Sequence, residues 1–299
     1  MSKIKSLSMA FAMAASLSAF AQATPGTPTA VAPGCQGLPS HQQLLAALSA
    51  ARAQQNGGFN LDMWGVVVNR DGIVCAVAFT GANRGSQWPG SRNIAAQKAN
   101  TANAFSLPQL ALSTAQLYTA TQPGGSLFGL QASNPVDPAV AYRGEPAAYG
   151  QWNDPMIGGR IGGVNVFGGG LGLYNAQHVL VGGLGVSGDS SCADHNISWR
   201  TRHTLNLDFV PGGVSGDTQR PDNIVYDITN AQGLQIGTSA SGWGHPVCSA
   251  AATTIAGELP AVQEQFASRP TGWRVRWAAP AWVFGRSERR VRRRRLGLI

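Results

Sequence analysis

Two apolar segments joined by a tight turn restrict the fold of this chain more than any other feature. Residues 63–69 and 73–80 are apolar and rich in β-branched side chains, and the turn between them reads Asn69-Arg70-Asp71-Gly72. Asp-Gly is a strong signal for a β-hairpin, because glycine readily adopts the positive φ that such turns need. The sequence therefore predicts an antiparallel pair of strands early in the chain.

Predicted helices flank this hairpin and further strands follow it. Ser40 is suited to cap a helix over residues 41–54, and Ser91 a second helix over residues 92–105. Further along the chain we expect a helix at 108–120, strands at 161–167, 171–174 and 179–186, and a closing helix at 189–205. This order is typical of an α+β fold with an antiparallel sheet, and not of an alternating βαβ fold.

The net charge of +8 comes from the two ends of the chain. Lys3 and Lys5 supply two positive charges, and the stretch from Arg286 onward carries seven arginines and one glutamate. The residues between these ends hold 13 basic and 13 acidic side chains, so the body is neutral. A basic balance is a signal for nucleic acid only where it forms a patch on the folded domain. We therefore expect no specific nucleic-acid partner.

The N-terminal segment has the organisation of a secretory signal peptide. Two lysines precede an apolar run over residues 7–20, which ends in small-x-small sites at residues 19–23. The run is too short to span a bilayer, which takes about 20 apolar residues. We therefore expect residues 1–23 to be a signal peptide, residues 24–39 a linker, and the protein to be periplasmic or secreted with no transmembrane segment.

The four cysteines are widely spaced and show no zinc-binding pattern. In an oxidising compartment an even number of cysteines favours disulfides, and four allow three connectivities. We favour Cys35–Cys75 and Cys192–Cys248, because each pair flanks one predicted structural unit. Four buried free thiols are the alternative.

Four motifs together resemble a known family. They are residues 64–72, 96–105, 159–164 and 181–188, the last followed by Asp194. In order and spacing they are similar to the GlcG/HbpS-like heme-binding family over about residues 40–205. The resemblance implies a profilin-like fold, an antiparallel sheet flanked by helices, which usually assembles as a homo-oligomer. It also implies heme as a suspected cofactor, with heme breakdown in some members.

The chain departs from the short members of this family in three places. It has a long insertion at about residues 130–157, an extension at 206–250 that we expect to pack on the domain, and a tail at 251–299. The insertion and the extension could cover or replace the pocket of simpler relatives. The arginine-rich tail suits non-specific binding to anionic lipid or nucleic acid, but a poorly ordered tail, or one produced by an altered reading frame, is the simpler interpretation.

The resemblance places a candidate ligand site on the 92–105 helix and the glycine-rich strand ends. Thr101 matches the family's helix motif and is the candidate heme-contacting residue, while Lys98 is suited to pair with a propionate. Alternatively, both side chains merely line the junction between helix and sheet. The expected cofactor-binding residues are Lys98, Thr101, Phe105, Gly162, Gly163 and Ser187.

A second candidate site is a metal centre at Asp194, His195 and His245. The Cys192–Cys248 bond would draw the His245 loop toward the helix, and two imidazoles with a carboxylate are a common ligand set. The alternative is that Asp194 caps the helix and the histidines form local hydrogen bonds. The glycines at 182–188 superficially match a dinucleotide fingerprint, but they lie in a strand-like run, so close packing or a ligand loop is the better interpretation.

No nucleophile elbow or suitably spaced carboxylate pair is present in the sequence, so we assign no catalytic residue. The sequence favours an exported protein that binds a small molecule, with heme as the leading ligand. The alternatives are a heme-degrading or redox enzyme on the same pocket, and an oligomeric structural protein without a ligand.

Overall fold

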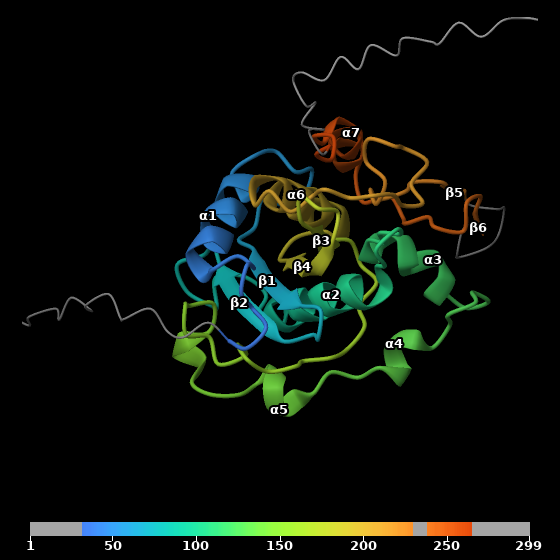
Figure 1. Cartoon of the computed structure of the whole chain (residues 1–299). Helices are drawn as coiled ribbons and strands as arrows, with labels where there is room; N and C mark the ends of the chain where they lie inside the picture. The colour runs from blue at the N-terminus through green and yellow to red at the C-terminus, as the bar shows by residue number, and fades with distance from the viewer. Residues whose placement is uncertain (1–31, 230–237, 265–299) are drawn as a thin grey trace, which may run out of the picture. The chain divides into compact units, whose positions relative to one another are not determined.

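The computed structural model describes residues 32–229 and 238–264 (Figure 1). The predicted signal peptide, the first part of the linker and residues 265–299 of the predicted tail lie outside these ranges. Within the described ranges, no helix has both the length and the apolar character needed to cross a membrane.

A four-stranded antiparallel sheet forms the centre of the domain. Its strands are β1 (Trp64–Asn69), β2 (Val74–Phe79), β3 (Gly170–Tyr174) and β4 (Leu180–Ser187), in the order β2-β1-β4-β3. The predicted hairpin is β1–β2, with Trp64 opposite Phe79 and Gly72 in the turn at a φ of 75°. The α+β class, a profilin-like antiparallel sheet flanked by helices, is confirmed.

Helices cover both faces of this sheet (Figure 1). Helices α1 (His41–Arg52) and α6 (Ser191–Thr204) pack on one face, where Leu44, Val67 and Ile197 belong to one buried apolar cluster. Helix α2 (Ser91–Phe105) packs on the other face against the alternate residues of β1. Successive residues of a strand point to opposite faces, so the apolar run of β1 serves both cores.

The remaining elements are short, apart from α7. They are η1 (Thr114–Leu117), α3 (Tyr118–Thr121), α4 (Leu130–Ser133), α5 (Pro138–Ala141), η2 (Pro146–Ala148), β5 (Ile228–Thr229), β6 (Thr238–Ser239) and α7 (Ala250–Glu258). Strands β5 and β6 form a small separate sheet.

Three predicted elements differ from the structure. Residues 161–167 form no strand, because Gly162 and Gly163 adopt φ values of 63° and 78°, which interrupt extended backbone. The predicted helix at 108–120 is replaced by a loop followed by η1 and α3, since the Ser106 hydroxyl bonds both backbone groups of Leu112 and holds the loop. Helix α2 begins at Ser91, so Gly90 and not Ser91 stands at its cap position.

The C-terminal extension reaches further than residue 250. Helix α7 packs against α6, and Ala252 and Ala256 share a buried cluster with Trp199. The Trp199 indole also donates a hydrogen bond to the Pro260 carbonyl at 2.9 Å. The predicted start of the tail at residue 251 is therefore incorrect, because the following residues bury apolar surface on the domain.

Both predicted disulfides are present, Cys35–Cys75 and Cys192–Cys248. The alternative of four free thiols is excluded. The first bond fastens the segment before α1 to β2, and the second joins the start of α6 to the segment before α7.

Candidate functional site

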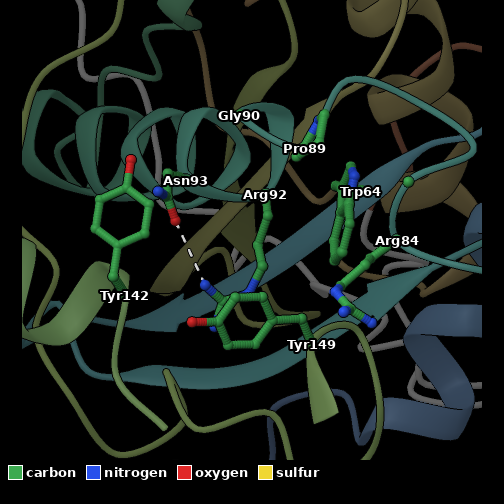
Figure 2. A pocket seen from close by; sticks show the side chains of 9 residues that line it. Trp64, Arg84, Pro89, Gly90, Arg92, Asn93, Tyr142 and Tyr149 are labelled. Carbon is green, nitrogen blue, oxygen red and sulfur yellow. Dashed lines mark hydrogen bonds between the residues drawn. The ribbon is translucent and has the colours of Figure 1, made fainter. Parts of the chain in front are cut away.

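A cavity of about 400 Å³ opens beside the N-terminal end of α2 (Figure 2). Pocket volumes of about 300–1,000 Å³ are typical of small-molecule sites. Its lining comes from β1, from the loop before α2, from the first turn of α2 and from the insertion. The lining residues are Trp64, Arg84, Gly85, Pro89, Gly90, Arg92, Asn93, Tyr142 and Tyr149.

Three aromatic side chains, Trp64, Tyr142 and Tyr149, line the cavity. Trp64 is buried, stacks on Phe79 with 4.2 Å between ring centroids, and donates its indole N–H to the Gln87 side chain at 3.1 Å. Tyr142 is 68% exposed and stands across the view of Figure 2 from Trp64. The indole is therefore fixed in place, while Tyr142 forms an accessible rim.

Two arginines at the cavity differ in their surroundings. Arg92 is buried, pairs with the Asp154 carboxylate through two N–H groups, and lies 3.7 Å from the centroid of the Tyr149 ring. Its charge is therefore neutralised within the protein. Arg84 is exposed and has no hydrogen bond or ion pair to any residue that the structure describes. Arg84 is thus the cation available to an anionic ligand.

The cavity combines features suited to a flat, mainly apolar ligand that carries an acidic group. Aromatic rings stack on planar ligands, and a guanidinium binds a carboxylate through paired hydrogen bonds. The Tyr142 hydroxyl has no hydrogen-bond partner among the described residues, so its oxygen is free to contact a ligand. A phenolic oxygen is also one of the known protein ligands of heme iron.

The structure places Lys98 away from this cavity and gives it an internal partner. Its ammonium donates to the Asp194 carboxylate at 2.7 Å and to the Val186 carbonyl at 3.1 Å, and both charged side chains are buried. Burial lowers the pKa of Lys98 and raises the pKa of Asp194 to about 6, because it disfavours both charged forms. Lys98 therefore has a structural role in this conformation.

Thr101 is likewise fully engaged. Its hydroxyl donates to the Gln97 carbonyl at 2.7 Å and accepts from the Asn165 N–H at 3.0 Å. The residue is completely buried. The interpretation that Lys98 and Thr101 line the helix–sheet junction describes the structure better than direct ligand contact.

The other predicted binding residues are distributed around α2. Phe105 is half-buried at its C-terminal end, and Gly162 and Gly163 lie beside Val136 of the insertion. Ser187 is buried at the end of β4, opposite Trp64 in the sheet. Among the six predicted cofactor-binding residues, Ser187 is the one that lies opposite a cavity-lining residue, Trp64, on the neighbouring strand.

The glycines of β4 permit close packing of a helix on a strand. A Cβ atom added to Gly185 would lie 1.9 Å from the Ala95 carbonyl oxygen, and one added to Gly183 would lie 2.2 Å from the Ala99 carbonyl oxygen. Such distances are far below van der Waals contact. The backbone of α2 therefore occupies the space above these glycines.

The proposed metal donors do not converge. Asp194 binds Lys98, His195 contacts Asn223 through Nε2 at 3.1 Å, and the His245 ring contacts Ser191 and the Pro246 carbonyl. Burial lowers the pKa of His195 to about 3 and that of His245 to about 4. The N-cap of α6 is Ser190 and not Asp194. In the described residues, His245 instead lies near Cys192 and Cys248.

Sequence reasoning missed most of the cavity. Trp64 begins the first of the four family motifs, at residues 64–72. No sequence motif marks Arg84, Tyr142 or Tyr149 as part of a site. The available signal was the insertion at residues 130–157, which supplies both tyrosines and Asp154. Its expected effect, covering or replacing a pocket, is consistent with this position.

Comparison with known proteins gives one family match and several structural ones. One similar solved structure is described as a PduOC–heme complex; it is 23% identical, the match covers 56% of this chain and 93% of that chain, and the TM-score is 0.39. Another is the ORFY protein of Klebsiella pneumoniae; it is 22% identical, the match covers 55% of this chain and 86% of that chain, and the TM-score is 0.37. No curated protein gives a significant match. The family model described as haem-degrading protein HbpS-like matches residues 40–201, more than half of the sequence. The chain therefore belongs to the HbpS-like family.

Proposed function

We propose that this protein binds heme in the cavity beside the N-terminal end of α2. The observation that carries the proposal is the combination, in one cavity of about 400 Å³, of aromatic lining residues, the unpaired Arg84 and the free Tyr142 hydroxyl. Membership of the HbpS-like family supports heme over other flat, acidic ligands.

The cavity residues fit the chemical parts of heme. Tyr142 is suited to hold the iron through its phenolic oxygen, Arg84 to pair with a propionate, and the half-buried Tyr149 to pack against the ring. Bound heme would supply an iron centre able to change oxidation state. The chain's own contribution is to orient this group and to shield one face of it with aromatic surface.

Titration of the purified protein with hemin tests the proposal. Saturable growth of a Soret band is expected, and Tyr142→Phe should shift that band and weaken binding by about tenfold or more, because the ring remains but its oxygen is lost. Thr101→Val tests the alternative site, since it removes the Thr101 hydroxyl and keeps the volume. Urea denaturation accompanies it, because the Thr101 hydroxyl also accepts the buried Asn165 N–H. If Thr101→Val weakens hemin binding and Tyr142→Phe does not, the site suggested by the family resemblance, around Lys98 and Thr101, replaces the cavity.

Heme degradation at the same cavity is the second candidate, favoured by the description of the family. Ascorbate together with dioxygen, or hydrogen peroxide alone, would then cause loss of the Soret band with formation of a cleaved porphyrin. A band that persists under both conditions identifies a binding protein.

We also propose that the protein is exported, to the periplasm or outside the cell, and assembles as a homo-oligomer. The signal-peptide pattern at residues 1–23 and the two disulfides support export. Cell fractionation with mass analysis of the mature N-terminus tests export, and light scattering on the purified protein tests assembly. An uncleaved protein in the cytosol would contradict export, and a monomer in solution would contradict assembly.

A further inference from the structure

The Cys192–Cys248 disulfide lies against a histidine. Cys192 is the second residue of α6, and Cys248 stands just before the cap of α7. One donor atom from each of Cys192, Cys248 and His245 lies within 4.8 Å of the others. Cys192 and His245 are buried, while Cys248 is exposed.

We propose that reduction of this disulfide creates a binding site for a thiophilic divalent cation such as Zn²⁺, with Cys192, Cys248 and His245 as ligands. The site is separate from the heme cavity and does not depend on the proposed function. Oxidation closes the site and reduction opens it, so metal occupancy reports the redox state of its surroundings.

The three donors suit zinc in type and spacing. Two thiolates and one imidazole are a common zinc ligand set, with a water completing the tetrahedron. Donor atoms in a tetrahedral zinc–thiolate site are separated by about 3.8 Å. Once the S–S bond is broken, the two sulfurs must move apart to reach that separation, while His245 already lies within 4.8 Å of both.

The surroundings already orient the histidine and favour thiolate. The His245 Nδ1 lies 2.7 Å from the Pro246 carbonyl and its Nε2 lies 2.8 Å from the Ser191 hydroxyl. A hydrogen bond from Nδ1 to the Pro246 carbonyl fixes the ring and leaves Nε2 as the metal-binding nitrogen, once the Ser191 hydroxyl turns away from it. The Cys192 N–H, at the start of α6, donates to the Cys248 sulfur at 3.2 Å. A backbone donor at a helix N-terminus stabilises a thiolate.

Opening of the site requires a two-electron reductant, which we assign as a dithiol. Its thiolate attacks the exposed Cys248 sulfur, the disulfide breaks, and Cys192 leaves as a thiolate. The second thiol of the reductant then attacks the mixed disulfide and releases Cys248 as a thiolate, so the reductant becomes a disulfide. Two protons from the dithiol pass to solvent as Zn²⁺ binds both sulfurs.

The other disulfide provides an internal control. Cys35 and Cys75 have no third His, Cys, Asp or Glu donor at comparable distance among the residues that the structure describes. Reduction of that bond alone should therefore leave two thiols without a zinc site.

The experiment measures metal binding by the full-length mature protein before and after reduction with a water-soluble phosphine. Reduced protein should bind one Zn²⁺, and Co²⁺ in its place should give a thiolate-to-cobalt charge-transfer band. Oxidised protein should bind none. The Cys35→Ser/Cys75→Ser variant should behave like wild type, and Cys192→Ser/Cys248→Ser should lose the band.

His245→Asn should lower the Zn²⁺ affinity of the reduced protein by about 100-fold or more, since ligand-shell changes that only support a metal already cost about 10–100-fold. His178→Asn is its matched control, because His178 lies outside the cluster and has a φ of 57°, which asparagine tolerates. Circular dichroism follows folding in every sample. The proposal is overturned if folded, reduced wild type binds no Zn²⁺, if His245→Asn binds Zn²⁺ as wild type does, or if reduction unfolds the protein and Zn²⁺ fails to refold it.

Discussion

The two ends of helix α2 differ in how they meet the rest of the protein. At its start, Arg92 and Asn93 border an open cavity. Over residues 95–103, which we term the closed half, the helix backbone lies directly on the glycines of β4. The closed half leaves no room for a ligand because its contacts are backbone on backbone. One helix thus carries both a candidate binding site and a rigid attachment to the sheet.

The comparison shows that similar residue types serve different purposes at the two ends. A buried lysine in the closed half is paired with Asp194, and an exposed arginine at the cavity has no partner in the described chain. Glycine at position 185 prevents a clash, whereas an added Cβ at Gly90 would meet nothing within 4 Å. The following predictions test this division.

The largest effect is expected for Lys98→Ala. This change leaves the Asp194 carboxylate buried without its cation, and breaking a buried pair costs about 3–5 kcal/mol of unfolding free energy. Urea denaturation measures it. In the Lys98→Met/Asp194→Leu double variant, which removes both charges, most of the stability should return. A single variant as stable as wild type would show that the closed half does not depend on this pair.

Gly185→Ala should destabilise the protein by about 1–3 kcal/mol. Its new methyl group meets the Ala95 carbonyl, and helix and strand must separate to admit it. Gly90→Ala is the matched control at the cavity end, where the backbone φ of −64° suits alanine, and it should change stability by less than about 0.5 kcal/mol. Equal effects at the two positions would remove the distinction between the two ends.

Acid should weaken the buried network around α6 through His195. Its pKa is about 3 in the folded protein and about 6.5 when unfolded, so the unfolded chain binds more protons between these values. Stability contributed by the neutral imidazole is therefore full above pH 6.5 and is lost as the pH falls toward 3, by at most about 1.4 kcal/mol per pH unit. Urea denaturation from pH 7 to pH 4 should show a flatter pH dependence for His195→Gln than for wild type. Parallel curves would contradict this role.

Arg84→Ala should have the smallest effect, and only on ligand binding. Loss of the unpaired guanidinium should weaken hemin binding by about tenfold, or about 1.4 kcal/mol, without a change in stability. Arg84→Lys keeps the charge and should recover part of the affinity. Hemin titration with parallel urea denaturation separates the two effects. Unchanged affinity in Arg84→Ala would remove the propionate contact from the proposed site.

Much of the fold was predictable because its signals are local. The Asp71-Gly72 turn identified the β1–β2 hairpin, and the capping box of Ser40 and Gln43 marks the start of α1. Residues 161–167 were harder, since an apolar run with glycines suits a strand as well as a buried loop. Gly162 and Gly163 adopt positive φ values where they lie beside Pro135 and Val136 of the insertion, a contact that the local sequence does not specify.

The candidate site was far less predictable. Trp64, Arg84 and Tyr142 come from three separate parts of the sequence, and no spacing rule relates them. The predicted residues Lys98 and Thr101 lie on the correct helix but in its closed half.

The sequence by itself determined the hairpin, the main helices and the family, because each depends on local conformation or on an ordered set of motifs. The disulfide pairing was favoured by the sequence but needed the tertiary structure to choose among three connectivities. Only the tertiary structure decided which end of α2 is open. Which end is open depends on contacts between residues that are distant in the sequence. Lys98 forms an ion pair with Asp194, and Gly185 packs against the backbone of α2. Burial and pairing of such groups are properties of the folded chain, since a side chain's partner across about 100 residues is set by the packing of whole elements.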